Sequence, residues 1–306
     1  MCDAASIKKL IWDGNIAISL TLAKDELNTV GIPEPYFLMI PRFFYYPLIW
    51  IKIKHYYVHL DNKLKDKSLF WLENNGKPLK WNYPIGVLYD TYQNKITKPW
   101  NLVIHFENYP YQQLLQYTAE TIEALFFSML KEADYLKSKS QNINSLQKKD
   151  LNQLWQSLIS NDFDLFWKIN CKLYQIPLPK DLQIYHLPFR IYINDEIVQN
   201  RFPFYNTKSL NHDSGNPYLA HKLTELLTFC DINSENSKQD IEKSNIIKYD
   251  FNTNSLHDNN NYHKQCKKIC KRCICHGIDI PLETPLTYLY QNLSNPDNFL
   301  HLIIKS

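Results

Sequence analysis

The fold is decided by a short pattern that occurs twice, as Pro84-Ile85-Gly86-Val87-Leu88-Tyr89 and as Pro285-Leu286-Thr287-Tyr288-Leu289-Tyr290. In both copies Leu and Tyr follow the Pro by four and five positions, and a Pro-x-Asn-apolar sequence comes next, at residues 99–102 and 296–299. Proline suits the first turn of an amphipathic helix, because its missing N–H has no partner there. The repeat therefore predicts two copies of one structural unit, each with a short helix before a last strand.

The segments around the two copies have similar predicted elements. Around the first copy, polar and apolar residues alternate at 15–22, a short apolar run at 36–41 precedes a helical stretch at 48–60, and strands follow at 69–72 and 102–106. This order of strand, strand, helix, strand, short helix and strand is that of the ubiquitin-like β-grasp fold, in which one main helix packs across a mixed sheet.

The second segment follows the same order with one interruption. A hairpin is predicted at 187–204, a helix at 218–229, a strand at 274–280, a helix from Pro285 and a last strand at 299–304. Residues 231–265 are rich in Asn, Ser, Lys and Asp, a composition that buries too little apolar surface to order itself. A disordered insertion at about 231–270 is therefore expected.

The middle of the chain is predicted to be helical. Residues 118–174 contain no Gly and no Pro, and apolar residues recur there at helical spacing. Asn161 or Asp162 can cap the last helix of this stretch. The predicted fold class is α+β, with two ubiquitin-like domains flanking a helix-rich domain. The expected boundaries are 1–110, including a short N-terminal helix, 111–180 and 181–306.

The composition argues for an interaction scaffold and not for an enzyme. The 306 residues carry a formal net charge of only +3, which is too small for a dedicated nucleic-acid binder. Phosphate-loop, dinucleotide, zinc-protease and nucleophile-elbow motifs are absent, so no cofactor is predicted. No secretory signal is predicted from residues 1–6, and seven cysteines are an odd and unevenly spaced set, so a reducing, cytosolic compartment is expected.

One cysteine cluster could hold a metal ion. Its possible ligands are Cys266, Cys270, Cys273, Cys275 and His276. A structural zinc site usually joins two such groups separated by a loop, and here there is only one, so no metal is predicted. Cys273 and Cys275 stand where a strand should begin, and strand alternation is expected to bury one of them.

A lysine in the helical middle is expected to point into solvent. The apolar stripe through Ile122, Phe126 and Met129 defines one face of a helix, and Lys131 lies roughly opposite it at 100° per residue. Phe127 precedes Lys131 by four residues and is expected to be exposed beside it.

Six segments, in order along the chain, resemble the autophagy-related protein 5 family. They are residues 79–86 (LKWNYPIG), 131–134 (KEAD), 147–150 (QKKD), 188–192 (PFRIY), 282–286 (LETPL) and 296–301 (PDNFLH). The resemblance runs from near Ile11 to Ile304 and implies two ubiquitin-like domains around a helix-rich one. The region 231–275 is longer and richer in Asn than expected of the family.

The resemblance also implies a function. Lys131 would accept an isopeptide bond from the ubiquitin-like autophagy-related protein 12, delivered by dedicated E1-like and E2-like enzymes, with Phe127 as docking surface beside the bond. With autophagy-related protein 16, the conjugate would promote, in an E3-like way, the lipidation of autophagy-related protein 8 with phosphatidylethanolamine. The protein would be cytoplasmic and peripherally bound to the phagophore membrane. Arg42, Tyr83 and Gly86 would lie near a groove, formed by the three domains, for the N-terminal helix of autophagy-related protein 16.

Two other functions remain open from the residues alone. An adaptor with ubiquitin-like domains could bind partners without being modified. A small zinc or cysteine protein centred on residues 266–276 is the third hypothesis.

Overall fold

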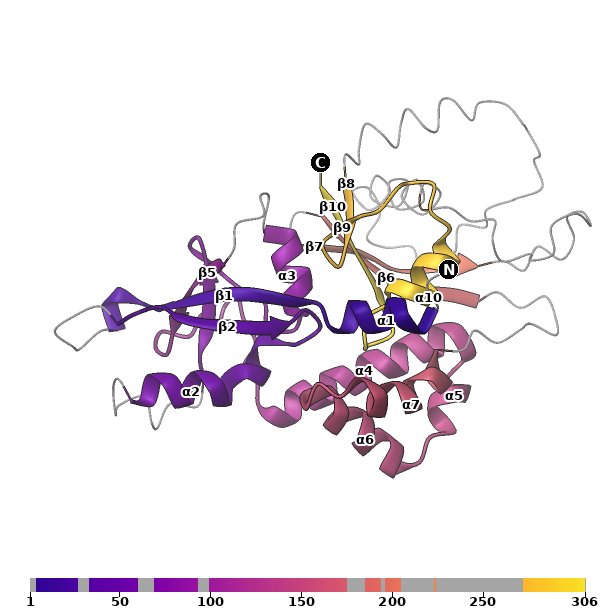
Figure 1. Ribbon diagram of the computed structural model, residues 1–306, viewed down its shortest axis with the longest axis horizontal. Coiled ribbons are helices and arrows are strands. Elements are labelled where there is room, and N and C mark those ends of the chain that lie inside the picture. The colour runs from indigo at the N-terminus through magenta and orange to yellow at the C-terminus, as the bar shows by residue number, and fades with distance from the viewer. Residues whose placement is uncertain are drawn as a thin grey trace, which may run out of the picture.

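The computed structural model describes residues 4–26, 33–59, 69–92, 99–174, 185–193, 196–204, 223 and 272–305. Figure 1 shows two sheet-containing modules and a group of helices that lies against both of them. We call these parts the N-terminal module (residues 15–106), the helical domain (residues 119–174) and the C-terminal module (residues 185–305). Within the described residues, every helix is too short or too polar to cross a bilayer.

The N-terminal module is a five-stranded mixed sheet with one main helix. Its strands are β1 (Asn15–Leu22), β2 (Tyr36–Pro41), β3 (Trp71–Asn74), β4 (Lys77–Pro78) and β5 (Trp100–His105). They lie in the order β2-β1-β5-β3-β4, with β1 and β5 parallel. A 3-10 turn η1 (Lys24–Glu26) follows β1. The 3-10 turn η2 (Tyr46–Ile49) leads into the main helix α2 (Trp50–Val58), and α3 (Ile85–Tyr92) precedes β5.

The C-terminal module repeats this arrangement. Its strands β6 (Tyr185–Ile193), β7 (Glu196–Phe204), β8 (Arg272–Cys275), β9 (Ile278–Asp279) and β10 (Leu300–Lys305) lie in the order β7-β6-β10-β8-β9, with β6 and β10 parallel. Helix α10 (Leu286–Leu293) occupies the place of α3, and both helices begin directly after the prolines of the repeated pattern. The repeat is confirmed, except that β5 begins one residue after Pro99 whereas β10 begins four residues after Pro296.

Two predictions for the C-terminal module differ from the described structure or lie outside it. The single strand expected at 274–280 is wrong: β8 and β9 pair antiparallel around a tight turn, because His276 and Gly277 adopt left-handed φ values of 52° and 77°. The helix expected at 218–229 and the insertion at about 231–270 lie outside the described residues apart from Leu223. That residue is buried in the core of the module and donates its N–H to the Thr284 carbonyl at 3.1 Å.

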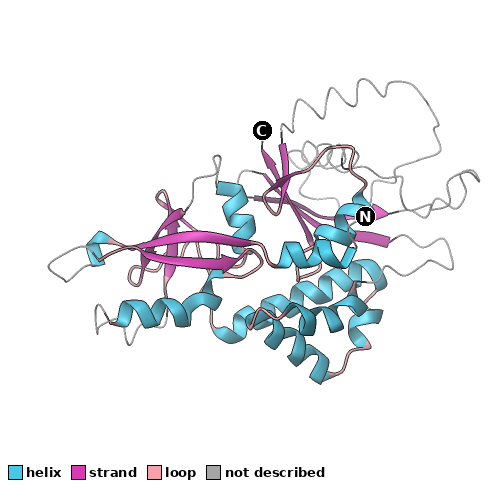
Figure 2. Ribbon diagram, viewed as in Figure 1, coloured by secondary structure: helices cyan, strands magenta, loops and turns pink. Residues whose placement is uncertain are grey.

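The helical domain consists of α4 (Ala119–Ser138), α5 (Gln141–Asn144), α6 (Lys148–Ile159) and α7 (Phe163–Leu173), labelled in Figure 1. Figure 2 shows this part of the molecule as a group of cyan helices below the strands. Asp162, one of the two predicted caps, begins α7, and its carboxylate accepts from the Leu165 N–H at 3.0 Å. Asn161 has a φ of 58° and forms the turn before the cap. The short helix α5 was not predicted.

Helix α1 (Ala4–Trp12) precedes the N-terminal module in sequence but packs elsewhere. Ile7 and Ile11 contact the core of the C-terminal module, next to α10 (Figure 1). The Trp12 ring lies 4.2 Å from that of Phe43 in the N-terminal module and 4.9 Å from that of Phe166 in α7. Helix α1 therefore contacts all three parts of the molecule.

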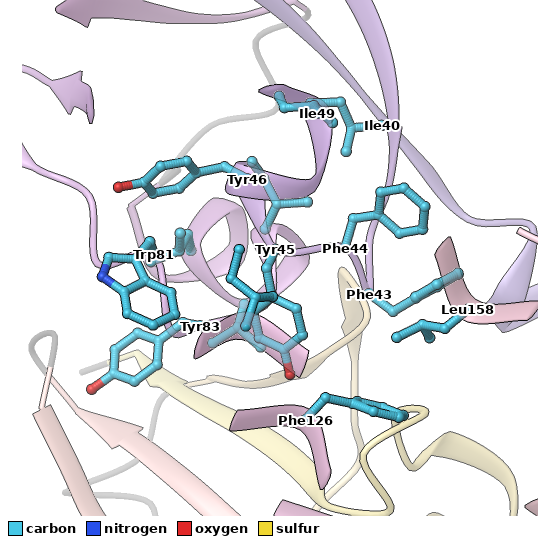
Figure 3. Packing of buried hydrophobic residues seen from close by; sticks show 14 of the residues in the cluster. Ile40, Phe43, Phe44, Tyr45, Tyr46, Ile49, Trp81, Tyr83, Phe126 and Leu158 are labelled. Carbon is cyan, nitrogen blue, oxygen red and sulfur yellow. The ribbon is translucent and has the colours of Figure 1, made fainter. Parts of the chain in front are cut away.

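The buried residues form two clusters. The larger one combines the N-terminal module, the helical domain and one face of the C-terminal sheet. Figure 3 shows its centre, where Tyr45 of the N-terminal module lies near Phe126 of α4. The second cluster lies on the other face of the C-terminal sheet, beneath α10 and Leu223. The C-terminal sheet is thus covered on both faces.

Candidate functional site

Helix α4 carries the predicted acceptor lysine on its exposed side. Thr118 caps the helix by accepting from the Thr121 N–H at 3.2 Å, and Ile122, Phe126 and Met129 are buried as the apolar stripe predicts. Lys131 is exposed. Its orientation follows from the helical period, since burying the stripe leaves the opposite side in water.

Phe127 does not stand in solvent as expected. It is half-buried, packs against the large core and has its ring centroid 5.5 Å from that of Phe126. The expectation assumed that only one face of α4 is covered. Leu130, Asp134 and Lys137 are also buried, so the covered arc is wider and Phe127 lies at its edge. An edge residue of this kind remains accessible on one side.

Lys137, six residues after Lys131, is buried with only 1% of its surface exposed. Its Nζ donates to the Leu173 carbonyl at 2.5 Å and lies 5.8 Å and 5.4 Å from the ring centroids of Tyr174 and Tyr290. Burial lowers its pKa to about 7, against the opposing effect of Asp134. The amine thus joins α4, the end of α7 and α10. A periodicity count could have found it, because Lys137 lies within one turn of the buried stripe.

Both modules hold the turn of α4 that contains Lys131. From the N-terminal module, the Tyr45 hydroxyl lies 3.9 Å from Met129 Sδ. From the C-terminal module, Arg190 on β6 places one guanidinium nitrogen 3.2 Å from the same sulfur and the other 3.3 Å from Glu132 Oε2. The residues on either side of Lys131 are therefore contacted from two directions.

A buried polar cluster lies behind Arg190. Asp297 Oδ2 lies 2.9 Å from His301 Nε2 with both side chains 2% exposed, and the Tyr192 hydroxyl lies 2.8 Å from the other ring nitrogen of His301. Burial alone would raise the pKa of Asp297, but His301 and Arg190 outweigh it and hold that pKa below its usual value. A catalytic group must reach its substrate, whereas this cluster is sealed from solvent, so the cluster is structural.

Arg42 and Gly86, predicted to lie near a partner groove, meet where the two modules touch. The Arg42 guanidinium donates to the Gly86 carbonyl at 3.3 Å and to the Asp90 carboxylate, and the same carboxylate accepts from the Gly277 N–H at 2.8 Å. A Cβ on Gly86 would lie 2.8 Å from both Cβ and the carbonyl oxygen of Arg42, so only glycine fits without a shift of the backbone. Tyr83 is 9% exposed, and its ring packs edge-on against that of Tyr192 at 5.4 Å.

Two small cavities lie side by side at the junction of the three parts and share Asn295. One of them, of about 10 Å³, is lined by Arg42, Gly86 and Asp90 together with residues of the C-terminal module. The other, of about 30 Å³, is rich in aromatic groups and is lined by Lys8, Ile11, Trp12, Phe163, Phe166, Trp167, Asn170, Tyr174, Asn292, Ser294, Asn295 and Pro296. Asn170 Oδ1 is buried there without a hydrogen-bond partner in the described part of the chain. A volume of this size holds one or two waters or the tip of a side chain, and no cofactor.

The cysteines do not form a metal site within the described residues, where no group of three or more His, Cys, Asp or Glu could hold an ion. Cys266 and Cys270 lie outside that part of the chain. Cys273 and Cys275 are both buried, which corrects the expectation that only one would be, because residues two apart on a strand point to the same face. Burial lowers the pKa of His276 to about 4, and its Nε2 donates to the Leu293 carbonyl at 2.8 Å.

Two β-grasp modules around a helical domain define a class of proteins with two ubiquitin-like domains. Family models of autophagy protein ATG5 match all three parts: the UblA domain at residues 11–106, the alpha-helical bundle region at residues 119–176 and the UblB domain at residues 186–304. The chain belongs to the autophagy protein 5 family and has a role in autophagy.

Full-length relatives agree with this assignment. The chain is 33% identical to autophagy protein 5 of Drosophila melanogaster over 99% of its own length and 98% of that protein. It is 30% identical to autophagy-related protein 5 of Caenorhabditis elegans over 96% and 95% of the two chains. The crystal structure of Kluyveromyces marxianus Atg5 superposes with a TM-score of 0.68 at 20% identity, covering 98% of this chain and 99% of that one, which shows the same fold.

Proposed function

We propose that this protein is conjugated through Lys131 to the ubiquitin-like autophagy-related protein 12. With autophagy-related protein 16, the conjugate acts E3-like in the lipidation of autophagy-related protein 8 with phosphatidylethanolamine. The observation that carries the proposal is the exposure of Lys131 on α4, in a turn whose other residues are packed against both modules. The chain itself is an acceptor and a non-catalytic component, cytoplasmic and peripherally bound to the phagophore membrane.

In the conjugation step, the only reacting group that the acceptor protein supplies is the amine of Lys131. The neutral Nζ of Lys131 attacks the carbonyl carbon of the thioester that links the modifier's C-terminal glycine to the E2-like enzyme. A C–N bond forms, the C–S bond breaks, the cysteine thiolate of the E2-like enzyme leaves, and the amine gives up one proton. Since Lys131 is exposed, we expect the E2-like enzyme to supply the base and the surface that activate it. The accessible side of Phe127 offers apolar contact area beside the new bond.

The N-terminal helix of autophagy-related protein 16 is proposed to bind where the two cavities meet. The larger cavity is lined by residues of α1, α7 and the C-terminal module, and it contains aromatic rings and an Asn170 oxygen that has no hydrogen-bond partner among the described residues. An amphipathic helix docks in a groove through apolar side chains at i, i+3 and i+4 spacing, and a cavity of this size can take the tip of one of them. Arg42 and Gly86 line the neighbouring cavity and support its shape, and Tyr83 packs against Tyr192 of the C-terminal module.

The test is reconstitution with the modifier, its E1-like and E2-like enzymes and ATP. Lys131→Arg keeps the charge and removes the nucleophile, so the higher-mass conjugate should be lost. Lys149→Arg, at an exposed position of α6, is the matched control and should leave the yield unchanged. On liposomes containing phosphatidylethanolamine, lipidation of autophagy-related protein 8 should then be stimulated by the wild-type and control conjugates and not by Lys131→Arg.

The same experiment decides on the adaptor alternative. If wild-type protein forms no conjugate and still binds its partners, the protein is an unmodified adaptor. If Lys131→Arg forms the conjugate in wild-type yield, another lysine is the acceptor and the assignment of Lys131 is wrong.

A further inference from the structure

We propose that Arg190 is a positioning residue for the acceptor Lys131, so that conjugation requires the C-terminal module to be docked on α4. This inference rests on the proposed function, since it concerns how the lysine is presented to the charged E2-like enzyme. Arg190 is far from Lys131 in sequence and would act on it through α4.

The contacts of Arg190 are with residues that precede and follow Lys131 in the sequence of α4. One guanidinium nitrogen lies 3.2 Å from Met129 Sδ, two residues before the lysine, and the other lies 3.3 Å from Glu132 Oε2, the residue after it. At 100° per residue, Met129 and Glu132 lie 160° and 100° around the helix from Lys131. A rotation of α4 about its axis would move both away from Arg190, so the two contacts oppose such a rotation.

Arg190 is itself held firmly in the C-terminal module. Its side chain is only 14% exposed, and its guanidinium lies over the Phe299 ring at 4.4 Å. Burial disfavours its charge, but Asp297, Tyr192 and Glu132 together outweigh that effect and raise the pKa of Arg190. A planar guanidinium holds its donors in a fixed fork, so it restrains the position of the groups it contacts better than a flexible ammonium group would. The Arg190 side chain therefore links the module's buried polar cluster to the helix.

The N-terminal module contributes less to this orientation. Among the described residues, its polar contact at the same turn is the Tyr45 hydroxyl, 3.9 Å from Met129 Sδ, which is a weak interaction with sulfur. Without Arg190, Met129 would stay buried among apolar side chains. The rotation of α4 about its axis, and with it the direction in which the Lys131 side chain points, would be less well defined. A nucleophile misplaced by about 1 Å can lose on the order of a hundredfold in rate.

The experiment is single-turnover conjugation with saturating modifier-charged E2-like enzyme, comparing Arg190→Gln, Arg190→Lys and Glu132→Gln with wild type. The rate constant should fall about tenfold or more for Arg190→Gln, less for Arg190→Lys, and least for Glu132→Gln, which keeps an acceptor oxygen. Arg272→Gln is the matched control. It removes an arginine–carboxylate pair in the same module, at 2.8 Å from Asp279, that does not touch α4, and its rate constant should equal that of wild type.

A merely structural role predicts a different result. Loss of folded protein lowers the fraction of chains that are conjugated and leaves the rate constant of the remaining chains unchanged. An unchanged rate constant for Arg190→Gln would therefore overturn the positioning role, whatever the final yield.

Hydrogen exchange of the α4 amides gives a readout that does not depend on conjugation. Arg190→Gln should increase exchange around residues 129–132, and equal exchange in variant and wild type would contradict the inference. If wild-type protein is not conjugated, or Lys131→Arg reacts like wild type, the proposed function fails instead. The exchange data then still decide whether Arg190 orders this turn.

Discussion

The two ubiquitin-like modules have the same strand order but differ in what covers their sheets. In the N-terminal module, the core lies on one face, and the other face carries Phe37 and Met39 with 63% and 61% of their surface exposed. In the C-terminal module, consecutive residues of β10 are buried on both faces, one face against α10 and the other against the large cluster. Topology alone therefore does not say how a module is joined to its neighbours. The pattern of burial along its central strand does.

The largest effect should come from matched positions on the two central strands. Ile303 follows Leu302 on β10 as Val103 follows Leu102 on β5, and both face away from the main core of their module. Ile303 is 2% exposed, so Ile303→Ala should cost roughly 2–5 kcal/mol of unfolding free energy. Val103 is half-buried, and Val103→Ala should cost about 1 kcal/mol or less. Urea denaturation monitored by tryptophan fluorescence measures both, and similar losses would contradict the difference in covering.

The second effect concerns how the C-terminal module is attached. The pKa of Lys137 is lowered to about 7 in the folded protein, well below the value near 10.4 of an unfolded lysine, so the unfolded chain binds more protons between these values. Stability due to this group should therefore rise with pH, by about 2–3 kcal/mol between pH 7.5 and 9.5. Lys137→Met keeps the length of the side chain and should lack this rise. The measurement is the free energy of unfolding across that range, and parallel pH profiles for the two proteins would rule out the buried amine as its source.

The smallest effect is expected from substitutions at matched positions of the helices α3 and α10. Gly86 and Thr287 occupy the same position after the repeated proline, but a Cβ at Gly86 would press on the Arg42 backbone. Gly86→Ala should lower the unfolding free energy by roughly 1–3 kcal/mol through overpacking. Thr287 is buried with its hydroxyl unpaired in the described part of the chain, so Thr287→Val should be neutral or slightly stabilising. Thermal unfolding of both variants measures these changes in stability. If Gly86→Ala left the unfolding free energy unchanged, α3 could shift away from Arg42 at little cost.

Much of the fold could be predicted because it depends on local patterns. Alternation at residues 15–22, the prolines before α3 and α10, and the cap at Asp162 each produce the expected element. The site was less predictable, because it depends on which surfaces meet. The helical period could predict that Lys131 is exposed. It could not predict that Phe127 is half-buried, because that depends on a second part of the molecule packing against α4. The burial of Lys137 could be found from the helical period, but its contact with Leu173 and the contacts of Arg190 join residues far apart in sequence, and no local signal predicts those contacts.

The position of β5 and β10 has a consequence for synthesis of the chain. Each is the last strand of its module to be made, and each lies in the centre of its sheet, between β1 and β3 or between β6 and β8. During translation, the strands made earlier must wait with their inner edges unpaired until this last one arrives. A pause of the ribosome just before either strand would leave two separated halves of a sheet, whose bare strand edges can pair with another chain.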